Sequence, residues 1–109
     1  MRYRLIALDI DGTIRSREYP LSDRTRRTIA RVEGAGAIVT LATGRVFQSA
    51  VRSTAELDLR SPIASFQGAQ VRDPVTEEVL WHRLLTPEMV HMALDALDAL
   101  VQWDVAVMG

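Results

Sequence analysis

Residues 5–13 of the chain read Leu-Ile-Ala-Leu-Asp-Ile-Asp-Gly-Thr, an apolar run that passes into two aspartates, a glycine and a threonine. A short apolar run bounded by polar residues is typical of a buried strand, and we predict one over residues 3–8. Asp9 and Asp11 follow it, so both carboxylates can point into one cleft. Close carboxylates repel one another unless a cation neutralises them, and Mg²⁺ prefers oxygen ligands. Gly12 would let a phosphate approach main-chain N–H groups. The stretch therefore indicates a metal and phosphate site, with a plain Asp-Gly-Thr turn as the alternative interpretation.

Apolar runs alternate with helical patterns along the rest of the chain. We predict further strands at residues 37–42, 62–66, 79–84 and 103–108, and an extended segment at 70–72. Helices are predicted from an N-cap at Ser22 to residue 33, after Arg45 to residue 57, and from an N-cap at Thr86 to residue 100. This rhythm is typical of a parallel sheet with helices on its faces. Ligands in such sheets bind beyond the carboxyl ends of the strands, where residues 9–13 and 43–45 both fall.

The composition is that of a small globular domain. The chain has 109 residues, of which 48% are hydrophobic, and it has no cysteine and a net charge of −1. This charge gives no reason to expect a nucleic-acid or anionic-membrane partner. No apolar run is long enough for a membrane span or a secretory signal, so we expect a cytoplasmic protein. All 13 basic residues are arginine, so the chain offers no lysine ammonium to any site.

The last predicted helix carries apolar residues at helical spacing. Such spacing predicts a side that faces the core, made of Met89, Ala93, Ala96, Leu97 and Leu100. Trp81, in the preceding strand, is expected to pack between elements.

Three stretches resemble motifs of the haloacid dehalogenase superfamily. Residues 8–13, Leu-Asp-Ile-Asp-Gly-Thr, match its first motif, and residues 41–45, Leu-Ala-Thr-Gly-Arg, match its second. Residues 65–69, Ser-Phe-Gln-Gly-Ala, resemble the Asn-Gly-Ala turn of the Cof-like sugar phosphatases, the branch with a type IIB α/β cap, although Gln67 stands where that branch usually has Asn.

This resemblance implies an α/β fold in two parts. Residues 1–78 would form the N-terminal part of a Rossmann-like three-layer sandwich with a parallel sheet. Residues 79–109 would begin the cap domain and end inside it.

The same resemblance implies a Mg²⁺-dependent phosphomonoester hydrolase that acts on a small phosphorylated metabolite such as a sugar phosphate. Asp9 would be the nucleophile that forms an aspartyl-phosphate, and Asp11 the general acid and base. Asp9 and Asp11, the latter through its main-chain carbonyl, would bind the metal. The other implied contacts are Gly12, Thr43, Gly44 and Arg45 with the phosphate, and Gln67 and Gly68 with the substrate. Two alternatives stay open: Thr43 could also cap the following helix, and Arg45 could anchor its start instead of reaching phosphate.

Two further motifs of the superfamily, a lysine and a distal acidic pair, do not occur in this sequence. We therefore expect an N-terminal fragment with negligible turnover by itself, because lost preorganised charge costs several kcal/mol of transition-state stabilisation. Its unpaired sheet edges, at residues 3–8 and 103–108, are expected to favour self-association. Two other functions share the pattern: a phosphotransferase of the phosphomannomutase type, and a non-catalytic α/β binding or assembly module.

Overall fold

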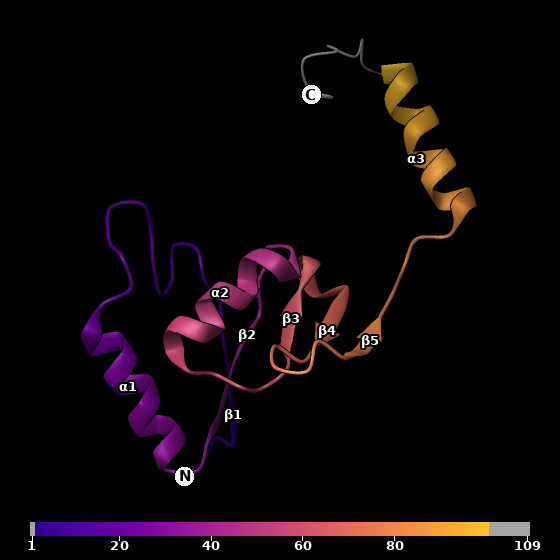
Figure 1. The fold of residues 1–109 in the computed structure, drawn as a ribbon. Helices are drawn as coiled ribbons and strands as arrows, with labels where there is room; N and C mark the ends of the chain where they lie inside the picture. The colour runs from indigo at the N-terminus through magenta and orange to yellow at the C-terminus, as the bar shows by residue number, and fades with distance from the viewer. Residues whose placement is uncertain (1, 101–109) are drawn as a thin grey trace.

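The computed structural model describes residues 2–100, a mixed α/β chain whose strands and helices largely alternate (Figure 1). The elements are, in order, β1 (Leu5–Leu8), α1 (Asp23–Gly34), β2 (Ile38–Leu41), α2 (Phe47–Leu57), β3 (Ile63–Ser65), the 3-10 turn η1 (Phe66–Gly68), β4 (Gln70–Arg72), β5 (Val79–His82) and α3 (Pro87–Leu100). Each predicted element within this range is present, with ends that differ by one or two residues. The strand predicted at 103–108 lies outside the described residues.

The parallel pairing of β1 and β2 determines how the other elements are arranged. β1 lies beside β2 in the register Leu5↔Ile38 through Leu8↔Leu41. A parallel bridge between Ala42 and Ala64 continues the arrangement to β3, and β3, β4 and β5 then pair in antiparallel fashion. The carboxyl ends of β1, β2 and β3 consequently meet at one edge, which confirms the predicted α/β class with a parallel sheet.

The core lies on one face of β1 and β2. Leu8 of β1 packs against a cluster of buried side chains from β2, β3, the two flanking helices and the connecting loops: Ile10, Leu21, Ile29, Val39, Leu41, Phe47, Ala50, Leu57, Leu59 and Ile63. On the opposite face, Leu5 is 60% exposed and its partner Ile38 is 53% exposed. Within residues 2–100, β1 pairs with β2 alone and forms an edge. This edge is one of the two on which our prediction of self-association rests, and the other, at residues 103–108, lies outside the described residues.

Local signals explain how α1 begins and which side it buries. Ser22 adopts an extended backbone at the N-cap, and its hydroxyl oxygen accepts a hydrogen bond from the Thr25 N–H at 3.1 Å. Ile29 is the buried residue of the helix, whereas Arg24, Arg27 and Arg31 are exposed. The helix therefore presents an apolar side to β2 and a charged side to solvent.

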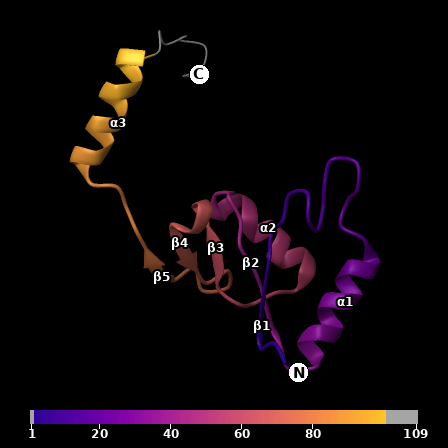
Figure 2. The same cartoon turned by 180° about the vertical axis from the view of Figure 1, so that it is seen from behind.

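The structure corrects the expected packing of β5 and α3. After β5 the chain leaves the body of the molecule along residues 83–86, and α3 projects from it in both views (Figures 1 and 2). All residues of α3 are exposed, Leu97 being 42% and Leu100 83% exposed, and Trp81 is 51% exposed. The apolar spacing is present, but the described part of the chain supplies no surface for it. The predicted start of α3 is confirmed, since Thr86 Oγ1 accepts from the Met89 N–H at 3.2 Å. None of the described helices is long and apolar enough to cross a membrane.

Phe47 offers a test of the one-sided core. Its side chain is 2% exposed, and the Arg72 guanidinium lies 4.2 Å from the centre of its ring. Phe47→Ala is expected to lower the free energy of unfolding by about 3–5 kcal/mol, because it leaves a cavity as well as losing burial. Leu84→Ala, at a residue that is 77% exposed, is the control and should change it by less than about 0.5 kcal/mol. Urea denaturation measures both, and equal effects would contradict this assignment of the core.

Candidate active site

The loop after β1 winds around one buried residue. Ile10 is completely buried, and its carbonyl accepts the N–H groups of Thr13 at 3.2 Å and Ile14 at 3.0 Å. The aspartates on either side of Ile10 are both exposed. The burial of Ile10 thus fixes the loop on the core while the carboxylates remain open to a ligand.

Gly12 adopts a backbone conformation that lets this loop turn. Its φ of +76° lies in the left-handed region, which a glycine adopts without steric cost. Its N–H donates to the carbonyl of Arg15 at 2.7 Å. The resemblance implied that this N–H contacts phosphate, but in the structure the N–H is hydrogen-bonded within the loop.

Thr13 orients the Asp9 carboxylate. The hydroxyl of Thr13 donates to Oδ2 of Asp9 at 3.1 Å. A hydroxyl four residues later in the chain can reach the aspartate because the loop turns back on itself after Ile10. The motif contains a hydroxyl residue four positions after Asp9, but the sequence analysis assigned no role to Thr13.

Asp11 and Arg45 form a two-pronged ion pair across the strand ends. Nε of Arg45 lies 2.7 Å from Oδ2 of Asp11, and Nη2 lies 2.5 Å from Oδ1. This pair lowers the pKa of Asp11, chiefly through the hydrogen bonds from the guanidinium, and it raises the pKa of Arg45. Nη1 of Arg45 also donates to Ser49 Oγ at 3.2 Å, in the first turn of α2. Of the two roles left open for Arg45, the described geometry shows the helix-anchoring one, with Asp11 as an unpredicted partner.

Thr43 follows β2, and hydrogen bonds of its backbone and side chain hold it in place. It is 6% exposed, its N–H donates to the Ala64 carbonyl at 2.9 Å, and its hydroxyl oxygen accepts the N–H of Arg45 at 3.0 Å. The N-cap of α2 is Val46. The alternative that Thr43 caps this helix is therefore wrong, because its hydroxyl closes the turn from Thr43 to Arg45, just before the N-cap.

Gln67 lies directly against Gly44. A Cβ atom on Gly44 would fall 2.3 Å from Nε2 of Gln67 and 2.8 Å from its Cδ. Phe66 and Gln67, with φ of 52° and 57°, both occupy the left-handed region that disfavours side chains. Non-glycine residues in this region concentrate at functional sites, where the surrounding structure maintains the strain. η1 thus brings the Gln67 amide next to the loop after β2.

A cavity of about 270 Å³ opens at this meeting point. Its polar lining comes from Asp9, Thr43, Gly44, Gln67 and Gly68. These are five of the eight residues that the sequence singled out. The other three, Asp11, Gly12 and Arg45, lie close by in the chain and do not line it.

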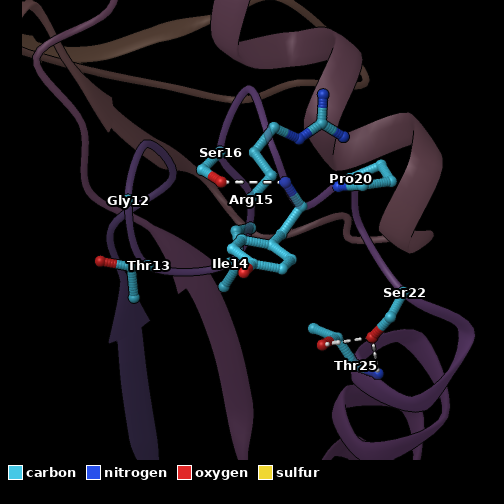
Figure 3. A pocket seen from close by; sticks show the side chains of 9 residues that line it. Gly12, Thr13, Ile14, Arg15, Ser16, Pro20, Ser22 and Thr25 are labelled. Atoms are coloured by element: carbon cyan, nitrogen blue, oxygen red, sulfur yellow. Dashed lines mark hydrogen bonds between the residues drawn. The ribbon is translucent and has the colours of Figure 1, made fainter.

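A larger cavity of about 530 Å³ lies on the other side of the loop, and residues from Gly12 to Thr25 line it (Figure 3). Ser22 and Thr25 both line it, and the Ser22 hydroxyl that caps α1 lies 3.0 Å from the Thr25 hydroxyl. The Arg15 side chain extends toward α2, where it pairs with Glu56, and Glu56 also lies 3.9 Å from Nη2 of Arg26. Because no carboxylate lines this cavity, the smaller one is the candidate active site.

The donor atoms are compatible with a partial Mg²⁺ site. Among residues 2–100 no three Asp, Glu, His or Cys side chains come together as a complete metal site. Mg²⁺ is, however, commonly held by one or two carboxylates together with water and phosphate oxygens. The exposed Asp9 carboxylate provides such a ligand, whereas both Asp11 oxygens are engaged by Arg45, so Asp11 could contribute through its main-chain carbonyl.

Comparison with known proteins finds relatives of this chain among phosphatases. The family model of the haloacid dehalogenase-like hydrolases matches residues 6–107. The 5-amino-6-(5-phospho-D-ribitylamino)uracil phosphatase YitU of Bacillus subtilis is 35% identical over 97 residues, which cover 89% of this chain and 34% of that protein. The Bacillus subtilis phosphatase YcsE, which carries the same substrate name, is 29% identical over 84% of this chain and 36% of its own length. The chain thus spans about a third of the length of these curated relatives.

Solved structures agree with this placement. A haloacid dehalogenase-like hydrolase from Bacteroides thetaiotaomicron superposes with a TM-score of 0.72 at 28% identity, over 90% of this chain and 38% of that protein. A structure from Thermotoga maritima gives a TM-score of 0.69 at 25% identity, over 91% of this chain and 37% of its own.

The Asp11–Arg45 pair predicts a pH effect. Arg45→Met should raise the pKa of Asp11 toward its ordinary value, because the carboxylate loses the guanidinium that favours its ionised form. The pair stabilises the fold above the unfolded-state pKa of Asp11, and this contribution disappears as pH falls through the lowered folded-state pKa. The variant should therefore be slightly less stable at neutral pH, by under about 1 kcal/mol for so exposed a pair, and the difference should vanish in acid.

Carboxyl NMR titration of Asp11 measures this shift. Arg52→Met, at an exposed arginine of α2, is the matched control and should leave the pKa of Asp11 unchanged. An unshifted Asp11 in Arg45→Met would show that the ion pair is absent in solution.

The contact between Gly44 and Gln67 predicts a coupled effect. Gly44→Ala should destabilise the fold by about 0.5–1.5 kcal/mol, because the new methyl group overlaps the end of the flexible Gln67 side chain and pushes it out of its present rotamer. In a Gln67→Ala background the same change should cost clearly less, giving a coupling energy in a double-mutant cycle. Gly34→Ala is the control, since a Cβ there meets nothing within 4 Å. Additive effects of the two substitutions would contradict the contact.

Proposed function

The chain belongs to the haloacid dehalogenase-like hydrolase family, and from that premise we propose that it provides the nucleophile and phosphate-binding part of a Mg²⁺-dependent phosphomonoester hydrolase. One observation carries this proposal: Asp9, oriented by Thr13, lines the same cavity as Thr43 and Gly44. Since the relatives are about three times longer, the activity is proposed for the intact protein that contains this chain.

The proposed reaction has two displacements at phosphorus. In the first, a carboxylate oxygen of Asp9 bonds to phosphorus, the P–O bond to the alcohol breaks, and the leaving oxygen takes a proton from Asp11. In the second, water bonds to the phosphorus of the aspartyl-phosphate, gives its proton to Asp11, and releases phosphate with the Asp9 carboxylate restored. Mg²⁺, held by Asp9 and the main-chain carbonyl of Asp11, would neutralise charge on the phosphoryl oxygens.

The Asp11–Arg45 pair sets a condition on this scheme. Both oxygens of Asp11 accept hydrogen bonds from Arg45, so neither can pass a proton to a leaving group in the described geometry. Asp11 can act only after this pair opens. A phosphate bound beside Asp9 would offer the guanidinium an alternative two-oxygen partner, which would release Asp11 when substrate is present.

The phosphate contacts are proposed for the rigid end of β2. The buried Thr43 side chain and the Gly44 backbone line the cavity beside Asp9, and the Gln67 amide lies against Gly44. A cavity of about 270 Å³ suits a phosphoryl group and the first atoms of a small leaving group. We propose a small phosphorylated metabolite with a sugar-like chain as substrate, in keeping with relatives named for a phosphoribityl compound.

Asp9→Asn tests the nucleophile. In the intact protein the substitution should lower turnover of phosphomonoesters by at least about 10³-fold and abolish the acid-stable phosphoenzyme, because the amide cannot form the acyl phosphate. Asp23→Asn, at an exposed acid in the first turn of α1, is the control and should keep both signals. Quench-flow labelling with a radioactive ester measures the phosphoenzyme, and product analysis separates water from a sugar hydroxyl as the acceptor. Retention of the phosphoenzyme in Asp9→Asn would refute the assignment, and its absence in the unmodified protein would favour a non-catalytic module.

A further inference from the structure

A third cavity adjoins the candidate active site. It has a volume of about 430 Å³ and lies between η1 and the segment that follows β5. Gln67 and Gly68 line both this cavity and the one that contains Asp9 and Thr43. A molecule with its phosphate beside Asp9 can therefore extend across η1 into the adjoining space.

Trp81 and Arg83 give this adjoining cavity its chemistry. They are two residues apart at the end of β5, so both side chains project from the same side of the extended chain, and both line the cavity. The backbone fixes them beside η1, since Trp81 pairs with Val71 in β4 and the N–H of Arg83 donates to the Ala69 carbonyl at 2.9 Å. The Trp81 ring is 51% exposed, and Arg83 is exposed as well. An indole face and a planar guanidinium with five N–H donors thus line the cavity that adjoins the candidate active site.

We propose that Trp81 and Arg83 form a leaving-group subsite for a planar heterocycle that carries hydrogen-bond acceptors. An exposed indole stacks on flat rings of many kinds, because every aromatic ring offers a π-face. A guanidinium donates hydrogen bonds to ring oxygens and nitrogens. The chain that links ring and phosphate would pass over Gln67 and Gly68. This inference rests on the proposed hydrolase function and adds to it the part of the substrate that is released.

The experiment compares two esters that share their phosphate end. Uridine 5′-monophosphate and D-ribose 5-phosphate differ by the ring, so the ratio of their kcat/KM values reports on ring recognition. In the intact protein this ratio should exceed one, and Trp81→Ala should lower it about tenfold, mainly through KM for the nucleotide, as expected for one lost ring stack. Trp81→Phe should restore most of the ratio, because it retains an aromatic face.

Leu80→Ala is the matched control. Leu80 is 50% exposed, nearly the same as Trp81, but it does not line the cavity. It should leave the ratio within twofold of the unmodified protein. A ratio that Trp81→Ala leaves unchanged, or that Leu80→Ala lowers equally, overturns the subsite while hydrolysis of ribose 5-phosphate still upholds the proposed function. Failure of the unmodified protein to cleave either ester overturns the proposed function itself.

Discussion

The parallel register of β1 and β2 is the constraint from which the site follows. Because Leu8 pairs with Leu41, the loop that begins at Asp9 and the loop that begins at Ala42 leave the sheet side by side. The bridge from Ala42 to Ala64 then brings β3, and η1 behind it, to the same edge. A slip of one residue would turn the buried side chains of a strand toward solvent, so the core enforces the register that the site requires.

The spacing of the two aspartates has a structural cause as well as a chemical use. The completely buried Ile10 lies between two exposed carboxylates, so the side chain that fastens the loop and those that face ligand alternate along three residues. An apolar residue at this position holds the loop without occupying the cavity. Asp9 then depends on Thr13 for its orientation and Asp11 depends on Arg45, so the two carboxylates reach different environments from neighbouring positions.

Sequence patterns predicted what depends on local chemistry. The strands, the helices, the caps at Ser22 and Thr86, and the convergence of residues 9–13 with 43–45 all follow from periodicity, capping residues and the geometry of parallel sheets. The Asp11–Arg45 pair joins residues 34 positions apart, and the hydrogen bond from the Gly12 N–H to the Arg15 carbonyl depends on how the loop closes. Periodicity specifies neither. The exposure of α3 could not be predicted for a related reason: an amphipathic pattern shows that a helix has an apolar side, and says nothing about what covers it.

The ion pairs of Glu56 have a consequence for the loop that carries the aspartates. Glu56 joins the end of α2 to Arg15, whose carbonyl receives the Gly12 N–H, and Arg26 of α1 lies at the margin of the same cluster. These side chains are partly exposed, so dissolved ions can screen their attraction, over a Debye length of about 8 Å at physiological ionic strength. The apolar core beneath them has no such sensitivity. Added salt should therefore loosen the segment from Gly12 to Arg15 before it affects the helices, which makes the ionic medium a selective influence on the part of the fold nearest the chemistry.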